Sequence, residues 1–172
     1  MFAFILALMS FLQPTNAPGV KWDYEPTARA IAKYSFSNPL WPREERGVER
    51  TADLLVSLSW FESNYNPDAE GDGHASFGLY QMTPGTAGSS PDALKDPDTA
   101  TRIALSLIRT SFRICKDYPA DERLGWYAHG GNSCANSDGR KKSKHRMWKA
   151  EWLGNKLPMP ESVLYASPTD SN

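Results

Sequence analysis

A long helical stretch over residues 43–63 constrains the fold of this chain more than any other segment. Small and apolar side chains recur along it with the spacing of one buried helix face, namely Val48, Ala52, Leu55 and Ser59. Glu62 continues this face, because a helical residue seven positions after Leu55 points in nearly the same direction. The pattern therefore predicts a core helix that carries a carboxyl group at the end of its buried face.

Two interpretations of Glu62 follow from this pattern. Burial without a nearby cation favours the protonated form of a carboxyl group, and a carboxylic acid that keeps its proton near neutral pH can act as a general acid. Alternatively, Glu62 lies at the helix end and its side chain reaches solvent, as most Glu side chains do. Periodicity by itself favours this second interpretation.

The rest of the chain also has helical patterns and no strong strand alternation. We predict helices over residues 23–36, 96–115 and 141–153, the last of them ended by Gly154. A length of 172 residues suits one domain with tails. We place this mainly α domain at residues 20–156, between an apolar segment at residues 1–18 and a Pro- and Ser-rich tail at residues 157–172, which we expect to be loose.

The N-terminal segment reads MFAFILALMSFL, and the first 18 residues carry no charged side chain. The apolar run is shorter than the ~20 residues of a transmembrane helix and has the length of the hydrophobic region of a secretory signal. No Lys or Arg precedes it, however, and cleavage after Ala17 would leave Pro18 next to the cut. The segment is a signal peptide, which implies export, or an apolar helix packed on the domain.

The segment after Glu62 combines turn signals with aromatic residues. Asn66-Pro67 predicts a sharp turn, and the nearby glycines Gly71 and Gly73 allow a tight loop. Residues 77–81 then mix aromatic, small and amide side chains, a combination that suits sugar binding through stacking and hydrogen bonding. The alternative is that Phe77, Leu79 and Tyr80 simply pack in the core.

In this region the sequence resembles the soluble lytic transglycosylase domain. The resemblance rests on the pair Glu62-Ser63, the turn Asn66-Pro67, the segment Gly78-Leu79-Tyr80-Gln81, and the helix start Pro84-Gly85-Thr86-Ala87. Downstream, Trp126-Tyr127 and the following glycines match an aromatic motif of the family, although Ala128 stands where the family has Asn. The resemblance covers roughly residues 50–131.

The resemblance implies a lysozyme-like, mainly helical fold with a short irregular or β-like segment near the active-site cleft. It implies cleavage of peptidoglycan between N-acetylmuramic acid and N-acetylglucosamine, with a 1,6-anhydro product and no cofactor. Glu62 would then be both general acid and general base. The residues expected to bind the glycan or support the acid are Ser63, Gly78, Tyr80, Gln81 and Tyr127.

Two other functions remain open. A hydrolytic muramidase would need a second carboxylate, for which Asp68, Glu70 and Asp72 are available, although turns have their own use for Asp. A non-catalytic glycan-binding or assembly protein could keep the fold, but such a protein has little reason to bury Glu62. The sequence leaves open endo or exo action and the biological setting, which includes wall remodelling, a secretion apparatus and phage lysis or entry.

The cysteines and histidines favour a disulfide over a metal site. Cys115 and Cys134 are the two cysteines, and in an oxidising compartment a bridge would tie the loop after Tyr127 to the preceding long helix. The alternative is two separate buried thiols. The three histidines are far apart in the sequence, and no Cys/His cluster is present, so we expect no metal.

The distribution of charged residues indicates which classes of binding partner the chain could have. The net charge of −1 gives no global case for nucleic acid, yet six of the 19 Lys and Arg residues lie between Arg140 and Lys149 without an acid. This basic helix could attract an anionic wall polymer or membrane surface, or simply be a solvated face over an aromatic inner face. We expect a monomer that acts on peptidoglycan strands, after export or as a phage component.

Overall fold

The computed structural model describes residues 1–12, 23–129 and 133–164. The helices in these parts of the chain are α1 (Phe2–Leu12), α2 (Glu25–Ser37), α3 (Gly47–Ser63), α4 (Pro84–Ala87), α5 (Pro91–Lys95), α6 (Pro97–Ile114), α7 (Gly125–Ala128), α8 (Ser137–Lys156) and α9 (Glu161–Leu164). Two 3-10 turns, η1 (Arg43–Glu45) and η2 (Ala120–Glu122), and two short strands, β1 (Glu70–Gly71) and β2 (Ser76–Phe77), complete the described elements. The predicted mainly α fold is confirmed.

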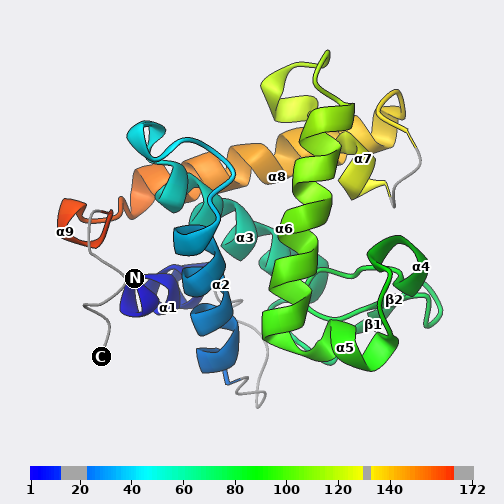
Figure 1. The fold of residues 1–172 in the computed structure, drawn as a ribbon, viewed down its shortest axis with the longest axis horizontal. Coiled ribbons are helices and arrows are strands. Elements are labelled where there is room, and N and C mark those ends of the chain that lie inside the picture. The colour runs from blue at the N-terminus through cyan, green and yellow to red at the C-terminus, as the bar shows by residue number, and fades with distance from the viewer. Residues whose placement is uncertain (13–22, 130–132, 165–172) are drawn as a thin grey trace.

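Helix α3 is the centre of the fold. It packs against α8 as well as against α1 and α2, and α2 in turn packs against α6. Leu54, Leu55 and Leu58 of α3 are fully buried, because neighbouring helices cover it on more than one side. In Figure 1, α1 and α2 lie on one side of α6, whereas α4, α7 and the strands lie on the other.

The predicted helix over residues 43–63 is divided by a backbone reversal. Arg46 has a φ of 55° and separates η1 from α3. The next residue, Gly47, packs closely on the preceding loop, and a Cβ atom there would lie 2.0 Å from the carbonyl oxygen of Trp41. Only a residue without a side chain fits at this position, so Gly47 allows the start of α3 to pack against the loop.

Helix α8 is longer than the predicted span at both ends. It begins at Ser137, and the side chain of the preceding N-cap residue, Asn136, accepts hydrogen bonds from the N–H groups of Asp138 and Gly139. The expectation that Gly154 ends the helix is wrong, because Gly154 lies inside it. A Cβ atom there would lie 2.5 Å from a carboxyl oxygen of Asp53, so this glycine permits close packing of α8 on α3.

The N-terminal segment is a packed helix in the structure. Ile5, Leu8 and Met9 of α1 are fully buried in contact with the core formed by α2 and α3. The proposed cleavage site after Ala17 lies outside the described residues, so cleavage stays a prediction. Within the described ranges, no helix combines the length and the apolar character needed to cross a membrane.

The C-terminal segment is ordered further than expected. Met159 is 2% exposed, and its backbone N–H donates to Oε1 of Glu49 at 2.6 Å. Leu164 of α9 is also buried. The expectation of a loose tail from residue 157 is therefore wrong up to Leu164, because a buried carboxylate and the core hold this segment. Residues 165–172 lie outside the described part of the chain.

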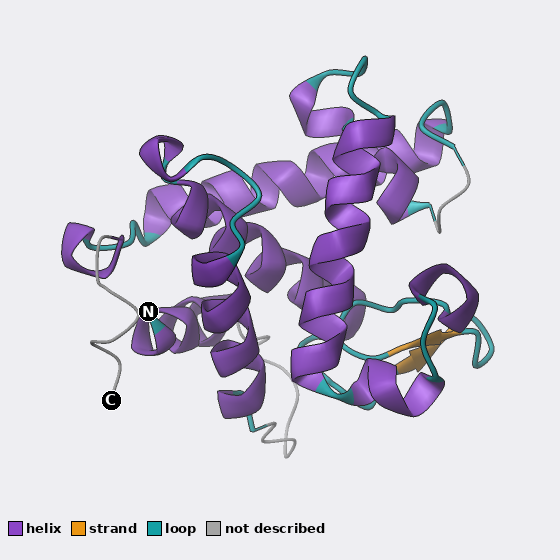
Figure 2. Ribbon diagram, in the orientation of Figure 1, coloured by secondary structure: helices purple, strands orange, loops and turns teal. Residues whose placement is uncertain are grey.

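A small β segment follows α3. Strands β1 and β2 are antiparallel, with Glu70 paired to Phe77 and Gly71 paired to Ser76 (Figure 2). Between them the backbone has positive φ at Asp72, Gly73 and His74, which makes the tight turn. The predicted short β-like segment is confirmed, and it lies directly after the helix that carries Glu62.

A disulfide joins Cys115, immediately after α6, to Cys134, shortly before α8, with a Cα–Cα distance of 5.5 Å. The predicted bridge is confirmed. Its closed loop contains α7 and Tyr127, whereas Gly130 and Gly131 lie outside the described residues. The bridge therefore ties the loop that carries Tyr127 to the end of the long helix α6.

Candidate active site

Glu62 lies in the last turn of α3, and the chain leaves this helix sharply. Asn64 and Tyr65 both have positive φ, and the Tyr65 side chain is buried beneath the turn. The hydroxyl of Ser63 donates to the carbonyl oxygens of Ser59 and Leu79, at 3.1 and 3.0 Å. Ser63 therefore joins the helix end to the segment after β2, as a support for the position of Glu62.

The carboxyl group of Glu62 contributes to a pocket of about 290 Å³. The predicted site residues that line this pocket with it are Tyr80, Gln81 and Tyr127, whereas Ser63 and Gly78 do not line it. Further walls come from α6, α7 and α8 and from the residue that follows α7, through Leu107, Trp126, His129, Lys142 and Arg146. The structure thus brings four of the six predicted catalytic and binding residues together, from three separate regions of the chain.

Arg146 of α8 is the partner of Glu62 that the sequence interpretation missed. Its Nε–H and Nη2–H groups both donate to Oε1 of Glu62, at 2.9 and 2.6 Å. The two side chains are only 12% and 18% exposed. The first interpretation of Glu62 considered burial without a nearby cation, whereas the packing of α8 on α3 places a guanidinium group beside it.

A signal for Arg146 is present in the sequence. The buried residues of α8 follow helical spacing and include Gly139, Ser143, Ala150 and Leu153. Arg146 occupies the missing position of this face, three residues after Ser143 and four before Ala150. A charged residue on a face of small and apolar residues is the same signal that singled out Glu62.

Tyr127 is held in place from both of its ends. Its backbone N–H donates to the Ser111 hydroxyl at 3.1 Å, and its own hydroxyl donates to the carbonyl oxygen of Tyr80 at 3.3 Å. Burial, and then the charge of Glu62, raises the pKa of the Tyr127 hydroxyl well above its ordinary value. The hydroxyl therefore stays protonated and acts as a hydrogen-bond donor at the pocket wall.

Gly78 supports the pocket indirectly instead of lining it. Its φ is +77°, and a Cβ atom would lie 1.8 Å from the carbonyl oxygen of Leu94. Its backbone N–H donates to the carbonyl oxygen of Ala69 at 2.9 Å. The expected contact between this backbone and the glycan is not supported, because the glycine is used for close packing inside the fold.

Gln81 and Tyr80 were expected to bind the glycan, but both side chains make contacts within the fold. The Gln81 amide nitrogen donates to the carbonyl oxygens of Ala69 and Gly78, and its amide oxygen accepts from Ser76. The side chain therefore holds its own loop while it lines the pocket. Tyr80 is 2% exposed and Phe77 is also buried, so these rings pack in the core, as the alternative interpretation had it.

Of the three candidate second carboxylates, Asp72 alone lines the pocket. It accepts a hydrogen bond from Ser76. Glu70 pairs with Lys95 and His74, and hydrogen bonds from these two residues lower the pKa of its carboxyl group. Asp68 is exposed, and its backbone N–H is bound by the Asn66 side chain, as expected of a turn residue.

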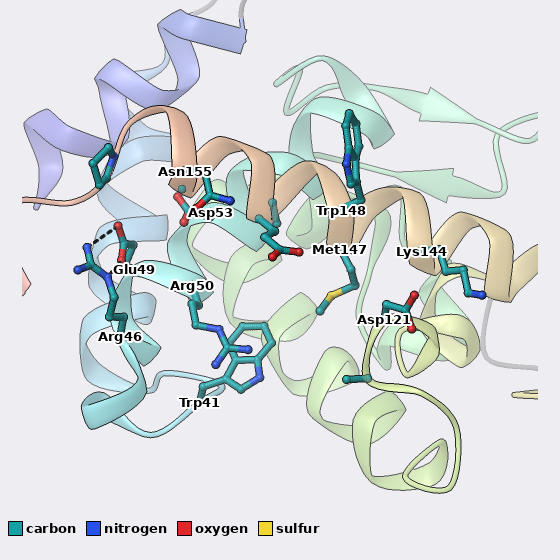
Figure 3. A pocket seen from close by; sticks show the side chains of 15 residues that line it. Trp41, Arg46, Glu49, Arg50, Asp53, Asp121, Lys144, Met147, Trp148 and Asn155 are labelled. Atoms are coloured by element: carbon teal, nitrogen blue, oxygen red, sulfur yellow. Dashed lines mark hydrogen bonds and ion pairs between the residues drawn. The ribbon is translucent and has the colours of Figure 1, made fainter.

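A larger cavity, of about 820 Å³, lies elsewhere and contains none of the motif residues. It is bounded by α3 and α8, with Trp41, Arg50, Asp53 and Trp148 among its lining residues (Figure 3). Size is thus a poor guide to the site, since the motif residues converge on the smaller pocket. In the described ranges, no group of three or more His, Cys, Asp or Glu side chains could hold a metal ion.

Comparison with known proteins gives one result that agrees with this geometry. The family model described as the transglycosylase SLT domain matches residues 40–150, which is more than half of the chain. No curated protein and no solved structure matches. The matched range includes Glu62, Tyr127 and Arg146, and it spans both walls of the pocket. The chain therefore belongs to the transglycosylase SLT domain family.

Proposed function

We propose that this protein is a lytic transglycosylase that cleaves the β-1,4 bond between N-acetylmuramic acid and N-acetylglucosamine in peptidoglycan. Membership of the SLT family supports peptidoglycan as the substrate. The observation that carries the proposal is the position of Glu62, a mostly buried carboxyl group that lines a pocket at the end of the central helix. Such a group can exchange a proton with a bound sugar while solvent is largely excluded.

The proposed reaction needs one carboxyl group in two successive states. Protonated Glu62 first donates its proton to the glycosidic oxygen, and the bond from this oxygen to the muramoyl anomeric carbon breaks. The muramoyl 6-hydroxyl oxygen then bonds to the anomeric carbon, and its proton passes to the Glu62 carboxylate. One strand end becomes a 1,6-anhydro sugar, the other recovers a 4-hydroxyl group, and the enzyme returns to its protonated form without using water.

Tyr127 would assist as a fixed part of the pocket wall. Its backbone is held by Ser111 and its hydroxyl by the carbonyl group of Tyr80, so the ring has a defined position in the pocket wall. The disulfide between Cys115 and Cys134 closes the loop on which Tyr127 lies. We propose that this loop orients the muramoyl sugar against Glu62, with Tyr127 and Trp126 on the sugar side of the pocket.

A hydrolytic muramidase is the second candidate, and the placement of Asp72 is the observation in its favour. Asp72 shares the pocket with Glu62, so it could activate a water molecule as the second carboxylate of a glycosidase. Its hydrogen bond with Ser76 and its positive φ equally suit a turn residue. A non-catalytic binding protein is the third candidate, and the buried carboxyl group argues against it.

The compartment follows from the substrate. Peptidoglycan lies outside the cytoplasmic membrane, so we propose that the protein acts in the periplasm or the cell wall. A disulfide supports this proposal, because disulfides persist in oxidising compartments.

The test combines one substitution with product analysis on purified peptidoglycan. Glu62→Gln should leave a folded protein whose lytic activity falls by roughly 10²-fold or more, the scale of general acid–base catalysis. Glu44→Gln, at an exposed position in η1, is the matched control and should keep full activity. Near-normal lysis by Glu62→Gln would refute the assignment of Glu62.

Mass spectrometry of the released fragments separates the two enzymatic functions. Anhydromuramic ends, each lighter by one water than a hydrolysis product, would support the transglycosylase. Reducing ends alone would support the muramidase, and Asp72→Asn should then abolish activity as completely as Glu62→Gln does.

A further inference from the structure

The cavity of about 820 Å³ between α3 and α8 contains a buried acid that the proposed reaction does not use. Asp53 of α3 lines this cavity and is only 4% exposed (Figure 3). Its Oδ1 atom has no hydrogen-bond partner among the described residues. Its Oδ2 atom lies against α8, where a Cβ atom on Gly154 would approach it to 2.5 Å. A buried polar atom without a partner is costly, so a ligand that supplies the missing hydrogen bond at Asp53 would be favoured.

The cations around this cavity are already paired. Each Lys or Arg residue that lines it has a carboxylate partner, in the pairs Arg46–Glu49, Arg50–Glu45 and Lys144–Glu122. Asp53 and Glu151, in contrast, make no ion pair in the described part of the chain. Glu151 lies on α8 three residues before Gly154, so it shares the side of the helix that contacts Asp53. The unpaired acids favour a cationic ligand over an anionic one.

The other walls indicate what kind of cation fits. A metal ion is not favoured, because the described ranges contain no group of three or more His, Cys, Asp or Glu side chains that could hold one. Trp41, Met147 and Trp148 give the cavity an apolar and aromatic lining. Aromatic faces attract cations, and Arg50 already lies 4.4 Å from the centre of the Trp41 ring. An alkylammonium ion suits such a site, since its head donates three hydrogen bonds and its chain is apolar.

We propose that this cavity binds an alkylammonium ligand, whose head group donates to Oδ1 of Asp53 and whose chain lies along Met147 and Trp148. The head group belongs either to a small free amine or to a lysine-type side chain of a peptide, since both present the same chemistry. None of the residues that line the pocket around Glu62 lines this cavity. Binding here is therefore independent of the proposed reaction, and its absence would leave that reaction untouched.

Binding should release a proton from Asp53. Burial, and then the Glu49 carboxylate, raises the pKa of Asp53 to about 8, so the free protein holds a neutral carboxyl group at pH 7. The ammonium head favours the ionised form, so the carboxyl proton passes to solvent while the ligand keeps its own. About one proton should leave per ligand at pH 7, and the Kd should fall by up to about tenfold per pH unit between about pH 6 and pH 8. The other titratable side chains that line the cavity are Arg46, Glu49, Arg50, Asp121, Lys144 and Glu151.

Isothermal titration calorimetry of the full-length protein, in buffers without amines, measures both the affinity and the proton release. The probes are 1,5-diaminopentane for the free amine and Nα-acetyl-lysine amide for the peptide side chain. Nα-acetyl-norleucine amide has the same carbon chain without the ammonium group, so it should bind at least about tenfold more weakly. Titration in two buffers that differ in ionisation enthalpy gives the number of protons that the wild type releases.

Three variants locate the site. Asp53→Asn keeps the shape of the side chain but cannot ionise. It should weaken probe binding by about tenfold or more, the scale of a hydrogen bond to a charged group, and abolish the proton release. Asp117→Asn, at an exposed position outside the cavity, is the matched control and should bind like the wild type. Glu62→Gln should also bind normally, because the pocket around Glu62 is separate.

Binding of both probes would identify the shared ammonium group as the ligand, and binding of one alone would identify its source. No saturable binding, equal binding of the norleucine analogue, a Kd that does not fall from about pH 6 to pH 8, or unchanged binding by Asp53→Asn would each overturn the proposal. Loss of binding in Glu62→Gln would place the ligand in the other pocket and overturn it as well. The pH profile and the proton release need only the wild type, so they decide the question even if Asp53→Asn does not fold.

Discussion

Asp53 provides a prediction whose magnitude can be worked out from the structure. This α3 residue is 4% exposed, and its Oδ1 atom has no hydrogen-bond partner in the described part of the chain. Burial, and then the neighbouring Glu49 carboxylate, raises the pKa of Asp53 from 3.8 to about 8, although Arg46 opposes this shift. Asp53 is therefore neutral in the folded protein near neutral pH and ionised in the unfolded chain.

The sign of the pH dependence follows from the proton count. Between the unfolded pKa of 3.8 and the folded pKa of about 8, the folded protein holds one proton that the unfolded chain has lost. The free energy of unfolding therefore falls as the pH rises through this window, by about 1.4 kcal/mol per pH unit at most. From about pH 5 to pH 7 the expected loss is roughly 2 to 3 kcal/mol.

Asp53→Asn should abolish this pH-dependent fall in the free energy of unfolding, because the amide does not titrate. The amide also has nearly the same shape as the carboxyl group. The Tm of the wild type should fall relative to that of the variant by about 4 to 12 °C between about pH 5 and pH 7, since ~1 kcal/mol corresponds to 2–4 °C at this size. Thermal unfolding followed by circular dichroism measures this Tm difference at each pH. Asp117→Asn, at an exposed position, is the matched control. Parallel Tm curves for wild type and Asp53→Asn would refute the reasoning.

Two further predictions concern the disulfide and α1. Replacing both Cys115 and Cys134 by Ser should lower the lytic activity while the far-ultraviolet spectrum stays largely unchanged, because the bridge restrains the loop of Tyr127; full activity would contradict this. The loss of stability should be about 3 kcal/mol for a loop of this length. Leu8→Ala should cost about 2 to 5 kcal/mol in urea unfolding of the full-length chain, because this side chain is fully buried. An unchanged stability, together with a mature protein that lacks residues 1–17, would instead identify the segment as a leader.

The sequence by itself determined the helices and the position of the acid. The spacing of Val48, Ala52 and Leu55 predicts the buried face of α3, and Glu62 follows from it, because helical periodicity depends only on nearby residues. The turn chemistry at Asn66-Pro67 likewise predicts the end of this helix. Local patterns of this kind indicate which side of a helix is buried and where the chain turns.

Only the tertiary structure decided what meets that buried face. Arg146 pairs with Glu62 across 84 positions of sequence, and Gly154 permits contact with Asp53 where a helix end was expected. The amide of Gln81 is bound by its own loop, although its residue type suggested a ligand contact. Periodicity identifies a buried side chain but not its neighbour, because the neighbour depends on how α8 crosses α3. The charge beside the candidate acid is therefore a property of helix packing.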